Sequence, residues 1–227
     1  MTTLVIAAHP DDEILGCGGF TAKLSAAGET VHHLILAEGA TSRDAARDAA
    51  GRGEELSELA RCARAAGEIV GAASVSLEAF PDNRMDGVDL LDVVKVIERH
   101  IAERAPTRVL THAMSDVNID HRIVHDAVIA ATRPQPGNRI RELLFFEIMS
   151  SSEWRPPASL APFAPDYFVD ISARLDAKLA ALRAYAPEMR DWPHPRSVRA
   201  LDHLARLRGA SIGVEAAEAF MVGRICA

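Results

Sequence analysis

Short apolar runs alternate along the chain with longer stretches in which apolar residues recur every three or four positions. The runs have the length of buried strands, and the periodic stretches have the pattern of amphipathic helices. The pattern predicts strands over residues 4–6, 30–38, 73–80, 108–112, 143–149 and 166–171. It predicts helices over residues 13–27, 53–66, 88–104, 121–132, 171–186 and 197–207.

This alternation is typical of a mostly parallel sheet with helices on both faces, so the expected fold class is three-layer α/β. The chain has 227 residues, of which 48% are hydrophobic, and this is enough for one well-buried core. We therefore expect a single domain over residues 1–227.

Polar side chains gather where three of the predicted strands end. They lie in the segments 9–13, 81–87 and 116–121. The carboxyl ends of parallel strands share one edge of a sheet, which is where open α/β sheets bind ligands. We therefore expect the three segments to surround a common crevice.

The first polar segment, His9-Pro10-Asp11-Asp12-Glu13, follows an apolar run directly. Several acidic groups beside an imidazole in one turn are costly to hold without a cation. His9 and Asp12 are three residues apart across a strand-to-helix turn and can face one point, and Pro10 restricts the chain between them. The segment therefore predicts a metal site.

A third ligand from another strand end would complete an open metal site. We choose His121, because it closes the polar segment after the fourth strand and the neighbouring Asp120 can accept its second N–H. Three nitrogen and oxygen ligands with a free position are typical of a catalytic zinc, which lowers the pKa of bound water to about 7. Asp11 would then lie beside that water as a general base.

Three other interpretations compete with a catalytic zinc. A surface cluster of Asp and His without a metal is the first. The second is the facial triad of non-haem iron oxygenases, whose spacing is imitated by His9-x-Asp11 with a distant histidine, but those enzymes are all-β whereas this chain is predicted to be α/β. The third is a dinucleotide site, but Gly16, Gly18 and Gly19 lack GxGxxG spacing and are expected to allow close packing of a helix on the sheet.

The charge of the chain restricts its partners. A formal net charge of −7 argues against a protein that gains affinity from nucleic-acid phosphates, and it favours a small-molecule substrate. We recognise no export-signal pattern and no membrane-spanning apolar run, so we expect no membrane insertion and a cytoplasmic location. The three cysteines are widely spaced and predict neither a disulfide framework nor a zinc knuckle.

Several motifs together carry a resemblance to a known family. They are Ala8-His9-Pro10-Asp11-Asp12-Glu13 with Leu15-Gly16-Cys17-Gly18-Gly19, Arg52 with Glu55, Pro81-Asp82-Asn83, Asn118-x-Asp120-His121-Arg122 and, more weakly, Ala217-Glu218-Ala219-Phe220. The chain resembles the PIG-L or LmbE-like zinc-dependent de-N-acetylases, related to N-acetylglucosaminyl-phosphatidylinositol deacetylase and the mycothiol-pathway deacetylase. The resemblance spans nearly the whole chain and implies a Rossmann-like fold with its active site at the carboxyl ends of the strands.

The resemblance also implies roles for single residues. The ligands for Zn²⁺, or for Fe²⁺ or another divalent metal, would be His9, Asp12 and His121. Asp11 would be the general base, and Arg52 and Asp82 would contact the substrate sugar. The reaction would be hydrolysis of the acetamido group of an N-acetyl sugar conjugate to acetate and a free amine. Relatives often associate, so a homo-oligomer is compatible with the resemblance.

One position departs from the family pattern. Several relatives have His-x-x-His where this chain has Asn118-x-x-His121, so the histidine that polarises the tetrahedral intermediate is missing. Asn118 can donate a neutral hydrogen bond there. His194, from the same or a neighbouring subunit, is our candidate for restoring an imidazole, and the alternative is that it is a turn residue.

Two further expectations concern the rim of the site and the class of protein. Trp154 is expected to stack on a sugar face at the rim, or else to pin its own loop. The absence of a histidine at position 118 leaves open a non-catalytic metal-binding domain of the same fold.

Overall fold

The structure, a computed structural model, describes residues 1–226. Within these residues the strands form one seven-stranded sheet in the order β3-β2-β1-β4-β5-β7-β6. The strands are β1 (Thr2–Ala7), β2 (Thr30–Ala37), β3 (Ser74–Phe80), β4 (Arg108–His112), β5 (Glu142–Phe146), β6 (Tyr167–Asp170) and β7 (Ala217–Ile225). Strands β1 to β5 run parallel, whereas β7 is antiparallel to both of its neighbours. The sheet is therefore mostly parallel, as predicted.

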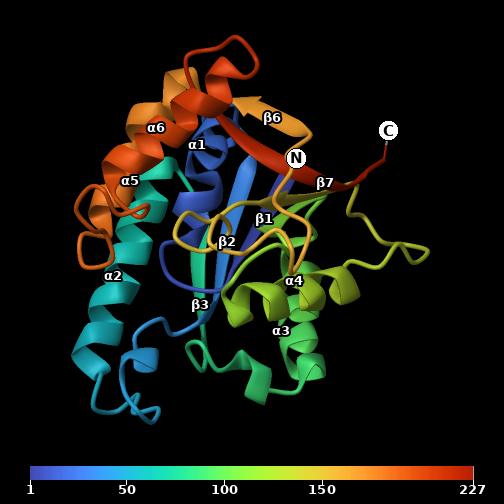
Figure 1. Ribbon diagram of the computed structural model, residues 1–227. Coiled ribbons are helices and arrows are strands. Elements are labelled where there is room, and N and C mark those ends of the chain that lie inside the picture. Colours follow the sequence, from blue (N-terminus) through green and yellow to red (C-terminus); the bar gives the residue numbers. More distant parts are fainter. Residues whose placement is uncertain (227) are drawn as a thin grey trace.

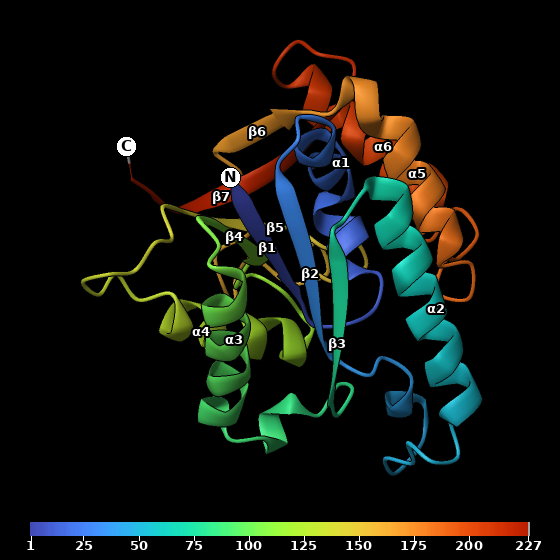
Figure 2. The same cartoon turned by 180° about the vertical axis from the view of Figure 1, so that it is seen from behind.

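Helices cover both faces of the sheet (Figure 1), and Figure 2 shows the sheet between the two layers from behind. One layer consists of α3 (Leu90–Arg104) and α4 (Ile119–Ala131). The other consists of α1 (Asp12–Ala26), α2 (Gly53–Val70), α5 (Leu175–Ala184) and α6 (Val198–Ala210). Each layer has its own apolar core, because alternate side chains of β1 face opposite sides: Val5 packs with the α1 layer and Leu4 with the α3 layer. The three-layer α/β class is confirmed.

The predicted elements are found with small shifts at their ends. The strand predicted over 108–112 is β4 with the same bounds, and the edge strand predicted over 166–171 is β6. The helix predicted over 171–186 begins as a short 3-10 turn, η3, before α5. The 3-10 turns are η1 (Thr41–Arg43), η2 (Met85–Gly87) and η3 (Ser172–Arg174).

Strand β7 is the element that the sequence pattern did not predict. It contains Glu218 and Gly223, so it lacks the continuous apolar run of an interior strand. It nevertheless lies between β5 and the edge strand β6, and its first four residues are buried.

The site lies beside β1, where the chain stops adding strands on one side of the sheet and begins to add them on the other. Strands β2 and β3 extend the sheet on one side of β1, and β4 and β5 extend it on the other. Helix α1 follows β1 onto one face, whereas α4 follows β4 onto the other. The carboxyl ends of β1 and β4 therefore border the crevice in which open α/β sheets bind ligands.

The glycines of α1 allow this helix to lie close to the sheet. A Cβ atom on Gly19 would lie 2.6 Å from the Ile171 side chain, and one on Gly16 would overlap the ring of Phe146. Close packing, rather than dinucleotide binding, therefore explains these glycines.

Candidate active site

The turn after β1 has an unusual backbone that is held by buried side chains. Asp11 adopts φ 116° and ψ −28°, a conformation that non-glycine residues rarely take. Its N–H donates to Glu13 Oε2 at 3.1 Å, and the Tyr185 hydroxyl donates to Glu13 Oε1 at 2.6 Å. These contacts fix the turn so that Asp11 and Asp12 both lie buried at the carboxyl end of β1.

Three donor atoms form a nearly equilateral triangle. His9 Nδ1, Asp12 Oδ2 and His121 Nε2 lie 3.3, 3.2 and 3.3 Å apart. A tetrahedral ion with bonds of about 2.0–2.1 Å to its ligands would separate them by about 3.3–3.4 Å, so the triangle has the size of one face of a zinc site. Asp12 Oδ1 is buried and, within residues 1–226, has no hydrogen-bond partner. The donor set and its spacing therefore fit a zinc ion.

A carboxylate lies beside the outer nitrogen of each histidine. His121 Nδ1 lies 3.0 Å from Asp116 Oδ2, and His9 Nε2 lies 3.0 Å from Asp120 Oδ2. The prediction that Asp120 accepts the second N–H of His121 is wrong. The cause is the start of α4, where Asp120 instead accepts the backbone N–H groups of Asn83 and Met85 and faces His9.

The charges of the triangle are strongly coupled. Burial alone would raise the pKa of Asp12, but His121 and His9 outweigh it and hold the pKa of this carboxyl well below its usual range. Burial alone would lower the pKa of His121, yet Asp12 and Asp116 raise it to about 9. The two carboxylates thus favour positive charge at this end of the crevice.

Asp11 lies beside the triangle and is paired differently. Its side chain is almost fully buried, and Arg196 Nη1 donates to its Oδ2 at 3.3 Å. Burial raises the pKa of Asp11 to about 7, although the Arg196 guanidinium opposes this shift. A carboxyl with a pKa near neutrality can both accept and return a proton, as a general base must.

Three residues of the site carried no assigned role in the sequence analysis. His112, at the end of β4, accepts the Ala8 N–H at 2.8 Å and stacks on His121 with ring centres 4.1 Å apart. Burial and the neighbouring His121 hold the pKa of His112 well below its usual range. The other two are Asp116 and Arg196. His112 ends β4 and Asp116 lies in the polar segment that follows it, whereas nothing in the pattern marked Arg196.

A cavity of about 530 Å³ adjoins this cluster. Asn118, Trp154 and His194 are among the residues that line it. Asn118 also caps α4, accepting the Asp120 N–H at 2.8 Å. His194 Nδ1 accepts the N–H of Arg196 at 3.0 Å, so its proton lies on Nε2. Trp154 is about half exposed and meets His194 edge to face, 5.9 Å between ring centres.

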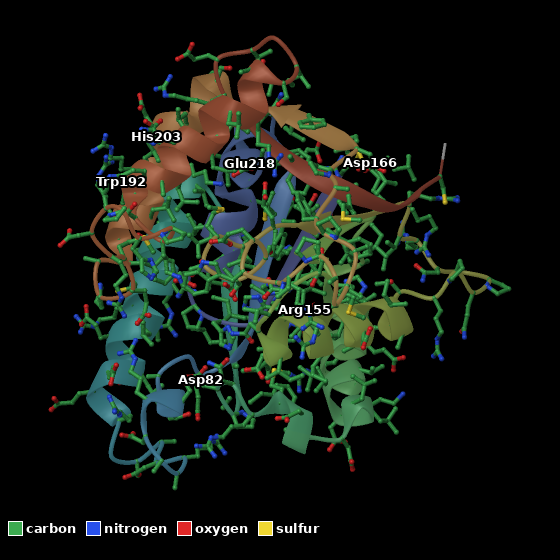
Figure 3. All side chains as sticks on the ribbon, viewed as in Figure 1. Asp82, Arg155, Asp166, Trp192, His203 and Glu218 are labelled. Carbon is green, nitrogen blue, oxygen red and sulfur yellow. The ribbon has the colours of Figure 1, made fainter. Side chains whose placement is uncertain are left out.

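The two predicted sugar-contacting residues are not among those that line the cavity. The guanidinium of Arg52 bonds Asp44 and Glu55, and Arg52 does not line the cavity. Asp82, labelled in Figure 3, is almost fully buried, and its Oδ1 lies 3.3 Å from His9 Nε2. Contact between these residues and a substrate stays a prediction.

Fold and donor set together define an α/β protein with a candidate metal centre at the point where the sheet changes direction. A family model described as "PIG-L: GlcNAc-PI de-N-acetylase" matches residues 4–132. The chain therefore belongs to the PIG-L family, which confirms the resemblance seen in its motifs.

Similar proteins agree with this assignment. The chain is 29% identical to "Uncharacterized deacetylase YaiS" of Escherichia coli K12, over 80% of this chain and 89% of that protein. It is 27% identical to "Probable N-acetyl-alpha-D-glucosaminyl L-malate deacetylase 2" of Bacillus cereus, over 80% and 81%. The crystal structure of the conserved protein TT1542 from Thermus thermophilus superposes with a TM-score of 0.78 at 26% identity, covering 99% of this chain and 96% of that one.

Among residues 1–226, no helix combines the length and the apolar character needed to cross a bilayer.

Proposed function

We propose that this chain is a zinc-dependent hydrolase that removes the acetyl group from an N-acetylated sugar conjugate. The observation that carries the proposal is the donor triangle of His9, Asp12 and His121 with Asp11 beside it. Membership of a family of deacetylases supports the reaction type.

The metal would be held by His9 Nδ1, Asp12 Oδ2 and His121 Nε2. When bound, it would supply Lewis acidity toward an amide carbonyl and acidify a water molecule. Fe²⁺ or another divalent ion could use the same donors, because imidazole and carboxylate bind several such ions.

Asp11 would move the proton that the reaction requires. Its carboxylate accepts a proton from the attacking water and passes it to the amide nitrogen as the C–N bond breaks, which gives acetate and a free amine. Arg196 keeps the carboxylate turned toward the crevice by its 3.3 Å hydrogen bond.

The cavity supplies neutral donors in place of the missing histidine. Asn118 Nδ2 donates to Asn83 at 2.9 Å, and both residues line the cavity. His194 carries its proton on Nε2 and lines the same cavity of the same chain. Either N–H can stabilise negative charge that develops on the carbonyl oxygen. Trp154 offers an aromatic face for the sugar ring.

Acetate release from a panel of N-acetylglucosamine conjugates tests the proposal. The panel contains nucleotide-, lipid-, thiol- and antibiotic-linked sugars, and the protein is loaded with zinc. We expect release from at least one conjugate, and a loss of at least about 100-fold in Asp11→Asn, since a general base contributes this much. Asp92→Asn, an exposed carboxyl on α3, is the matched control and should behave as wild type.

Two outcomes would contradict the proposal. If zinc is bound and no conjugate of the panel releases acetate, the result would favour a non-catalytic metal-binding domain. Acetate release in Asp11→Asn within about threefold of wild type, at equal metal content, would remove Asp11 from the mechanism.

A further inference from the structure

The cavity beside the donor triangle has an unusual charge. It is lined by two guanidinium groups, those of Arg190 and Arg196, and no carboxylate is among its lining residues within the described chain. The protein as a whole carries a formal net charge of −7. A cavity that is cationic in an acidic protein favours an anionic ligand.

The two guanidinium groups differ in how far they are already paired. Arg196 donates from Nε to Ser150 Oγ at 3.0 Å and from Nη1 to Asp11, so part of its charge is matched inside the site. Arg190 has no carboxylate within 4.0 Å among residues 1–226, and its one side-chain hydrogen bond is to the Pro187 carbonyl at 3.4 Å. Arg190 is exposed and thus presents a guanidinium charge that no carboxylate among the described residues matches.

The backbone ties Arg190 to Arg196, the residue whose side chain contacts Asp11. The Arg190 N–H donates to the Arg196 carbonyl at 3.1 Å, which joins the two ends of the loop that contains Trp192 (Figure 3). Arg190 thus lies on the wall between this cavity and a neighbouring hollow, which Arg183 and Asp191 line.

The size of the cavity leaves room for more than one group. At about 530 Å³ it falls within the range of sites that bury a drug-sized ligand. A sugar that places its acetamido group at the donor triangle would extend along this cavity, past Trp154 and toward Arg190.

We infer that the group attached to the sugar carries an anion, a carboxylate or a phosphate, and that Arg190 binds it. The inference rests on the proposed function, because it takes the acetamido group to lie at the donor triangle. A planar guanidinium binds either anion through paired N–H groups.

Binding of sugars that cannot be hydrolysed tests the inference without turnover. The probes are carboxymethyl glucoside, its neutral isostere carbamoylmethyl glucoside, and glucose 1-phosphate, each titrated by calorimetry into the zinc-loaded full chain. We expect at least one anionic glucoside to bind about tenfold more tightly than the neutral one, as a charge-assisted hydrogen bond allows. The carboxylate and phosphate arms show which anion is preferred.

The matched variants assign the preference to one residue. In Arg190→Gln the ratio of the neutral to the anionic Kd should fall to within about twofold of unity. Arg183→Gln removes an equal charge from the neighbouring hollow and should keep the wild-type ratio. Equal binding of all three glucosides, no binding of any, or a preference that survives Arg190→Gln would each overturn the inference.

Acetate release from the corresponding N-acetylglucosaminides is measured separately. A charge preference in binding without acetate release would refute the proposed function and leave the anion site standing. Acetate release without any charge preference in binding would refute the anion site and leave the proposed function standing.

Discussion

The orientation of His121 depends on a contact at its outer nitrogen. Asp116 Oδ2 lies 3.0 Å from Nδ1, and the same carboxylate is fixed by Ser152 Oγ and by the Asn118 N–H. A carboxylate in this place holds the ring so that Nε2 faces the other two donor atoms of the triangle, and it would make the imidazole a better metal ligand.

Asp116→Asn should therefore weaken zinc binding by about 10- to 100-fold, since partners of metal-binding histidines have effects of this size. Competition with a chromophoric chelator measures the Kd directly and needs no substrate. Asp126→Asn changes an exposed carboxyl on α4, the helix that carries His121, and is the control. A Kd for Asp116→Asn within about threefold of wild type would show that this contact does not orient the ligand.

The sequence could predict the residues of the site that lie next to each other along the chain. His9, Asp11 and Asp12 share one turn, and the polar segment after β4 supplied His121. The sequence could not predict which carboxylate faces which imidazole, because that pairing depends on where α4 begins relative to β1. Arg196 reaches Asp11 across 185 positions, so only the folded chain shows the pair.

Among the helices, α1 is divided by a kink whose two sides are both capped. Cys17 leaves the helical region at φ −149° and ψ 26°, which frees N–H groups after it and carbonyls before it. Glu218 on β7 accepts the N–H groups of Gly19 and Phe20 at 2.8 and 2.6 Å. Lys178 on α5 donates to the Leu15 carbonyl at 2.9 Å and to Glu218 at 2.6 Å.

Lys178→Met should lower the free energy of unfolding by about 3–5 kcal/mol, because it leaves the Glu218 carboxylate buried without its cation. Denaturant unfolding measures the change. Adding Glu218→Gln to this variant should recover part of the loss, since the amide removes the unpaired charge. Lys23→Met, an exposed lysine on α1, is the control. A loss in Lys178→Met no larger than in Lys23→Met would contradict this account of the kink.

The pair of Lys178 and Glu218 also explains why the sequence pattern did not predict β7. Glu218 interrupts an apolar segment, and an acidic residue argues against an interior strand when only periodicity is considered. In the fold this carboxylate is neutralised by Lys178 and by the open turn of α1. The strand is stabilised by contacts with elements about 40 and 200 residues away, which no local pattern contains.

Across the whole molecule, buried histidines respond to pH in opposite directions. His9 and His121 have raised pKa values because carboxylates surround them, although burial alone would lower both. His33 and His112 have lowered pKa values, mainly because burial disfavours their charged form. Of these four, His33 contacts Thr21 of α1 rather than the donor triangle, so its titration reports on folding.

His33 should make the fold less stable in acid. Burial lowers its pKa from 6.5 to about 3, so below about pH 6.5 the unfolded chain binds a proton that the folded chain does not. The contribution of His33 to the free energy of unfolding is complete above that pH and is lost as the pH falls toward about 3. The loss between pH 7 and 5 is about 2 kcal/mol. Denaturant unfolding at several pH values should therefore show a shallower acid loss in His33→Gln than in wild type. The exposed His203→Gln should keep the wild-type slope, and equal slopes in all three proteins would mean that His33 becomes protonated within the folded chain.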